Sequence, residues 1–172
     1  DNLKNYIKVN FNDFGKFLQN TQLSDSFIGG NGELVLNIDK DKIDLTGGNL
    51  SIDKVSIKNS SFLARLLQLA SFTGLLEILT NEGVPFDNIN VIFSKEKNTI
   101  DINEAKLQGF SLGGRFTGTT ELKSKNIDLK GVIVPAYAIN NLLNKIPLIG
   151  QIITGVEGDG IIGVNFEAKG TF

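Results

Sequence analysis

The residues best placed for acid–base chemistry are Glu157 and Asp159, in the stretch VEGDGI. Two carboxylates this close could form a catalytic pair or bind a cation. The stretch has too few oxygen ligands for a calcium loop and lacks the EF-hand pattern. It therefore predicts an acidic hairpin turn. A carboxylate-dependent hydrolase that uses these two residues is the alternative.

Other catalytic chemistry is limited by what the chain lacks. It contains no Cys, His, Met or Trp, which excludes disulfides, thiolate nucleophiles, Ser-His-Asp triads and the usual zinc sites. Gly113-Gly114-Arg115 is not a phosphate loop, because no Lys-Ser/Thr pair follows it. The net charge is −2, and no basic stripe marks a nucleic-acid-binding surface. We therefore expect no catalytic residues, no metal ion and no cofactor.

Most of the chain alternates between apolar and polar residues, which is typical of strands with one buried face. Clear examples are Leu34 to Asp39, Ile127 to Ile133 and Val164 to Lys169. Glycine pairs such as Gly29-Gly30 and Gly47-Gly48 separate the runs and predict turns.

A weak repeat relates Leu50–Ser61 to Ile100–Ser111. Both copies carry an extra residue in the middle, Lys54 in the first and Glu104 in the second, which shifts the alternation by one. A β-bulge or tight turn there would return the apolar side chains to one face. The repeat predicts a strand unit used twice in one curved sheet. Chance similarity is the alternative.

Three stretches favour helices. Residues 12–22 begin with a possible cap at Asn12 or Asp13, and Pro135 suits the first turn of a helix over 135–144. The longest spans 59–83, and its polar stripe rotates abruptly, which predicts a kink near Thr73-Gly74. It is apolar around most of its circumference, so it either packs in the core or lines a groove or membrane surface.

These elements predict a β-rich α+β fold. We expect a curved antiparallel sheet, shaped like a half-open gutter, with a long broken helix and a short C-terminal helix packed on its apolar face. The 172 residues suit a single domain over 1–172, and without Met we expect it to belong to a longer protein. No run of about 18 apolar residues is present to span a membrane.

Four segments in order resemble a known family. They are LARLLQLASFTGLLEILTNEGVPFDNI, LQGFSLGGRFTGTTEL, NIDLKGVIVPAYAINNLLNKIPLIGQIITG and EGDGIIGVNFEAKGTF, which together cover most of the chain from Ser61 onward. The Gly-x-Ile-x-Pro-Ala-Tyr signature, followed by Asn-x-Leu-Leu and Ile-Pro-Leu-Ile-Gly, is similar to the AsmA-like C-terminal region of bacterial envelope proteins of the AsmA, YhdP and TamB superfamily. The first 45 residues match only in pattern.

The resemblance implies a periplasmic location, with the parent protein anchored in the inner membrane. It implies a non-catalytic module of a bridge that carries phospholipid towards the outer membrane and supports outer-membrane biogenesis. The expected partners are phospholipid acyl chains and a membrane surface or outer-membrane protein. A scaffolding module for outer-membrane protein assembly, without bound lipid, is the alternative.

The lipid-binding prediction covers apolar residues of the long helix and of the C-terminal stretch. They are Phe62, Leu66, Leu69, Phe72, Leu75, Leu76, Leu142, Leu143, Ile146, Leu148, Ile149, Ile152 and Ile153. Pro147 and Gly150 interrupt the C-terminal stretch, which would close the end of the groove or enter a bilayer surface. Alternatively, these residues fill a hydrophobic core.

Overall fold

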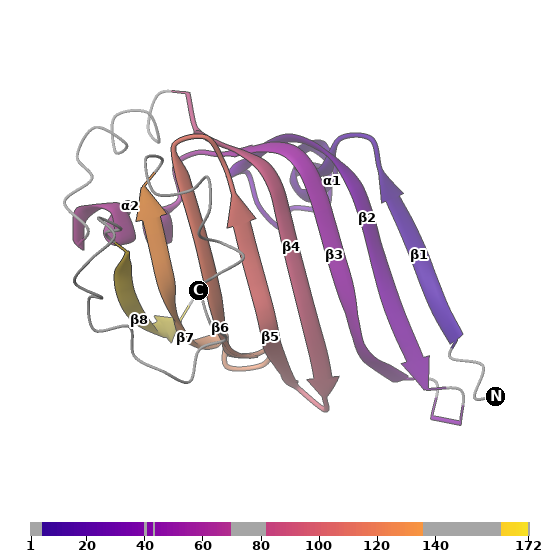
Figure 1. Ribbon diagram of the computed structural model, residues 1–172. Coiled ribbons are helices and arrows are strands. Elements are labelled where there is room, and N and C mark those ends of the chain that lie inside the picture. Colours follow the sequence, from indigo (N-terminus) through magenta and orange to yellow (C-terminus); the bar gives the residue numbers. More distant parts are fainter. Residues whose placement is uncertain (1–4, 40, 43, 70–81, 136–162, 172) are drawn as a thin grey trace.

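The computed structural model describes residues 5–39, 41–42, 44–69, 82–135 and 163–171. Their main feature is one eight-stranded antiparallel sheet in which each strand pairs with its neighbours in the sequence (Figure 1). The elements are, in chain order, β1 (Asn5–Phe11), α1 (Phe14–Asn20), β2 (Phe27–Asp39), β3 (Asp44–Ile57), α2 (Ser61–Leu69), β4 (Val84–Glu96), β5 (Thr99–Gln108), β6 (Leu112–Glu121), β7 (Asn126–Pro135) and β8 (Val164–Thr171).

The two ends of the strands differ. Short turns join β2 to β3, β4 to β5 and β6 to β7 at one end, which we call the hairpin end. The helices lie at the other end, which we call the helix-covered end (Figure 1). Buried residues of both helices, among them Phe14 and Leu67, belong to the same hydrophobic core as buried residues of the sheet.

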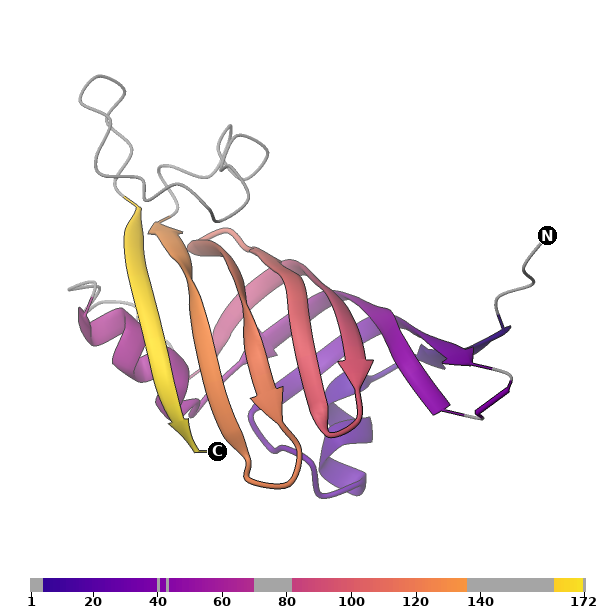
Figure 2. The ribbon, with the colours of Figure 1, turned by 90° about the horizontal axis from the view of Figure 1, so that it is seen from below.

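The sheet is curved, and its later strands pass in front of its earlier ones when seen from below (Figure 2). Alternation directs one set of side chains to the concave face, where Ile52, Phe86, Leu112 and Ile133 are buried. The strands predicted at 34–39, 127–133 and 164–169 are confirmed within β2, β7 and β8.

Local distortions of the strands keep apolar residues on this face. In β3, Ile52 and Val55 are both only 1% exposed although they are three residues apart. Lys54 adopts a left-handed conformation with φ of 54°, which absorbs the extra residue of the repeat. In β5 the register shifts between Ile102 and Ala105, around Glu104. The predicted shift of alternation is therefore confirmed in both copies.

The first predicted helix is confirmed as α1. The Asp13 side chain caps it, accepting a hydrogen bond from the backbone N–H of Lys16 at 3.0 Å. Phe14 then packs against Phe11 and Phe27, with ring centroids 5.3 and 5.6 Å apart. These aromatic contacts hold α1 against the start of the sheet.

The predicted α+β class is wrong, because the described residues are mostly strand and form a single antiparallel sheet. Of the long broken helix over 59–83, the structure describes only the nine-residue α2, and 70–81 lie outside the described residues.

The predicted C-terminal helix over 135–144 is wrong at its first residue. Pro135 is the last residue of β7, where it pairs with Leu112 and does not begin a helix. The β-branched run before it, Val132 to Val134, favours a strand, and proline is tolerated at the end of one. Residues 136–144, the remainder of that prediction, lie outside the described residues.

Candidate functional site: an apolar cavity under the helices

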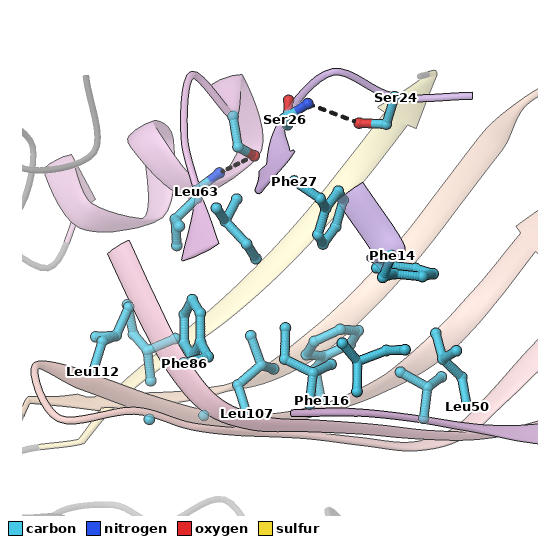
Figure 3. A pocket seen from close by; sticks show the side chains of 18 of the residues that line it. Phe14, Ser24, Ser26, Phe27, Leu50, Leu63, Phe86, Leu107, Leu112 and Phe116 are labelled. Carbon is cyan, nitrogen blue, oxygen red and sulfur yellow. Dashed lines mark hydrogen bonds between the residues drawn. The ribbon is translucent and has the colours of Figure 1, made fainter. Parts of the chain in front are cut away.

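A cavity of about 350 Å³ lies between the concave face of the sheet and the two helices (Figure 3). Its lining comes from α1, the segment before β2, the segment before α2, α2 itself and seven of the eight strands. The lining residues are Phe14, Ser24, Ser26, Phe27, Leu50, Ile52, Ile57, Ser60, Leu63, Phe86, Ile89, Val91, Leu107, Leu112, Gly113, Gly114, Phe116, Ile133 and Phe166.

Curvature of the sheet makes this cavity possible. Phe27 is on β2 and Phe166 on β8, six strand spacings apart. In a flat sheet, spacings of about 4.8 Å would separate them by roughly 29 Å. A single small cavity is lined by both, so the strands between them must wrap around it. The local twist at Gly29 (φ 68°), Gly30 (φ 91°) and Lys54 contributes to this bend.

A glycine lets two aromatic rings of the cavity lining pack close to each other. Gly131 of β7 pairs with Phe116 on one side and Phe166 on the other. The two rings lie 6.4 Å apart between centroids. A Cβ atom at Gly131 would approach the Phe116 Cβ to 2.5 Å, so the close packing requires glycine here.

The polar atoms of the lining side chains gather on one side. We call Ser24, Ser26 and Ser60 the serine rim. Ser24 and Ser26 lie opposite the sheet floor, where Leu107 and Phe116 are found (Figure 3). Among the described residues that line the cavity, none has a charged side chain.

Two hydroxyls of the serine rim organise the backbone around the cavity. Ser60 Oγ accepts the backbone N–H of Leu63 at 3.2 Å and so caps α2. Ser24 Oγ accepts the backbone N–H of Ser26 at 3.2 Å. A serine hydroxyl that accepts one hydrogen bond can still donate its own hydrogen. The rim therefore offers neutral donors to a ligand.

Charges lie on the opposite, convex face. Arg115 and Glu104 form an ion pair at 2.9 Å, and Lys169 and Asp128 form another at 3.1 Å. The hydrogen bond to the Asp128 carboxylate, together with its negative charge, raises the pKa of Lys169. These cross-strand pairs keep the convex face hydrated and leave the apolar side chains to the concave face.

In the part of the chain that the structure describes, no three His, Cys, Asp or Glu residues gather to hold a metal ion. Glu157 and Asp159 lie outside the described residues.

Three of the predicted lipid-binding residues, Phe62, Leu66 and Leu69, belong to α2, and their side chains are not described. The other ten lie outside the described residues. They are Phe72, Leu75, Leu76, Leu142, Leu143, Ile146, Leu148, Ile149, Ile152 and Ile153.

Sequence reasoning missed the strand residues that line the cavity. Ile52, Phe86, Ile89, Leu112 and Phe116 all belong to segments that alternate in the sequence. The alternation contained the signal that these residues share a face. It gave no indication of which part of that face is left unfilled.

Neither a family model, a curated protein nor a solved structure matches this chain. The resemblance to the AsmA-like region therefore stays a prediction. Among the described helices, none has the length and apolar character needed to cross a bilayer.

Proposed function

We propose that this chain is a non-catalytic lipid-handling module of a periplasmic bridge that carries phospholipid from the inner to the outer membrane. In this proposal the parent protein is anchored in the inner membrane and supports outer-membrane biogenesis and integrity. The location and the direction rest on the resemblance of the sequence to the AsmA-like region. The binding of lipid is supported by the cavity.

The observation that carries the proposal is an apolar cavity of about 350 Å³ whose lining, in the part of the chain that the structure describes, has no charged side chain. Each methylene group moved from water into such a site gains about 0.8 kcal/mol. An acyl chain can therefore bind through burial alone, without a covalent step. A carrier also has to release its cargo, and non-covalent burial allows that.

The test compares two adjacent residues of β4. Val91 lines the cavity, whereas its neighbour Ile92 is 43% exposed and points to the convex face. Val91→Trp fills the cavity and should lower the phospholipid that co-purifies with the chain about tenfold, because burial of about two methylene groups is lost. Ile92→Trp is the matched control and should retain lipid. Lipid is measured by native mass spectrometry and by solvent extraction.

Two results would count against the proposal. One is an unmodified chain that carries no lipid and takes up none from phospholipid vesicles. The other is equal lipid in the two folded variants, which would place the lipid outside the cavity.

A docking function is the second candidate, and the edge strand β1 favours it. Within the described residues β1 pairs only with β2, and its Tyr6 and Ile7 are 65% and 52% exposed on opposite faces. Such an edge can accept an extended strand of an outer-membrane assembly protein. Capture of that partner by a lipid-free chain, lost in a Tyr6→Lys, Ile7→Lys double variant, would favour this function.

A further inference from the structure

We infer that the cavity takes a single acyl chain and holds the uncharged, ester-linked end of that ligand at the serine rim. This inference rests on the proposed function and narrows its ligand to one chain of an amphiphile. It follows from the volume of the cavity and from the one-sided distribution of its polar groups.

The volume sets the number of chains. A methylene group takes about as much space as a water molecule in the liquid, roughly 30 Å³. A cavity of about 350 Å³ therefore holds about a dozen carbons of one chain. A phospholipid with two chains of about 16 carbons each would need roughly 1,000 Å³. One chain enters, and a second chain has to lie elsewhere.

The polar groups set the orientation. The floor of the cavity includes Leu50, Leu107 and Phe116, and its described residues have no polar side chain, so the methyl end of the ligand lies there. The Ser26 hydroxyl makes no hydrogen bond within the described part of the chain, and the Ser24 hydroxyl is left free to donate its hydrogen. Both can donate to the carbonyl oxygen of an ester.

The lack of charge shows which part of the ligand lies at the serine rim. No Lys or Arg is found among the described residues of the lining, so no cation in that part of the chain favours a phosphate over a neutral group inside the cavity. Asp25 stands between the two serines in the sequence, and an anionic headgroup at the rim would gain no attraction from it. One glycerol-linked acyl chain of a phospholipid has the chemistry that fits both ends of the cavity, with the phosphate and the second chain outside it.

The first experiment measures chain length. Monoacylglycerols from octanoyl to octadecanoyl are titrated into the 172-residue chain with the fluorescent dye ANS bound, and displacement of the dye gives their affinities. Affinity should rise about fourfold for each added methylene and level off near 12 carbons, where the cavity is full. A rise that continues to octadecanoyl overturns the single-chain limit and leaves the proposed function intact. Displacement by no member of the series contradicts both.

The second experiment tests the orientation. Ser26→Ala should weaken binding of the dodecanoyl ester about fivefold, the effect of one lost hydrogen bond, and should leave binding of dodecane unchanged. The matched control is Ser56→Ala, because Ser56 follows the buried Val55 and so points to the convex face. Equal affinities of both variants for the ester would overturn the placement of the polar end.

Discussion

The helix-covered end and the hairpin end of the concave face differ in how they use similar apolar residues. At the helix-covered end, Leu112 and Phe86 are 2% exposed beneath the two helices. At the hairpin end no described helix lies over the face, and Ile7 is 52% exposed. The concave face of one sheet thus supplies a packed core at one end and an accessible apolar side chain at the other. The cavity lies where the packed end is incomplete.

The largest expected effect is the difference in stability lost when one apolar side chain is truncated at each end of the concave face. Leu112→Ala should lower the free energy of unfolding by about 3 kcal/mol, because a buried side chain is lost and the cavity grows. Ile7→Ala should cost less than about 1 kcal/mol, because the side chain is already half in water. Urea denaturation measures both values. Similar losses would show that the hairpin end is packed as tightly as the other.

A smaller effect on stability is expected at Lys54, whose left-handed backbone bends β3 beside the cavity. Lys54 holds a left-handed conformation that costs an ordinary residue about 1–2 kcal/mol and costs glycine almost nothing. Lys54→Gly should therefore be about 0.5–1 kcal/mol more stable than Lys54→Ala, after allowing for the greater freedom of glycine in the unfolded chain. Both variants lose the same charge, so thermal unfolding compares the backbone alone. A more stable alanine variant would contradict the bend.

The smallest effect concerns acid stability at the hairpin end. Lys95 Nζ donates a hydrogen bond to Asp44 Oδ1 at 3.0 Å, and this bond lowers the pKa of Asp44 below its usual 3.8. The stabilisation is present above pH 3.8 and is lost as the pH falls through the lowered pKa of the folded state. Asp44→Asn should flatten this part of the stability–pH curve.

Lys95→Gln is the partner control for the acid-stability experiment. It removes the same hydrogen bond from the other side, so it should flatten the same part of the curve. If the stability–pH curve is unchanged in both variants, the Lys95–Asp44 pair does not contribute to acid stability.

The sequence predicted the strands better than the helices, for a physical reason. A period of two is set by the backbone itself, so the alternation in β2, β7 and β8 identified strands directly. Near Pro135 the same reasoning failed. Proline suits both the first turn of a helix and the end of a strand, and pairing with Leu112 decided between them.

The cavity could be predicted only in part. The phase shift at Lys54 correctly indicated that Ile52 and Val55 share the buried face. The position of the cavity depends on the curvature that brings Phe27 near Phe166, and this arises from pairing across the whole sheet. The sequence pattern indicates that the sheet curves, but it does not indicate how far, so it could not place these two residues around one cavity.

The pairing of each strand with its neighbours in the sequence has a consequence for how such a chain can form and change. Every pairing in the sheet joins segments that follow one another, so a hairpin can form before the rest of the chain arrives. Insertion or loss of one hairpin leaves all other connections in place. A gene can therefore lengthen or shorten this sheet in steps of two strands without rethreading the fold.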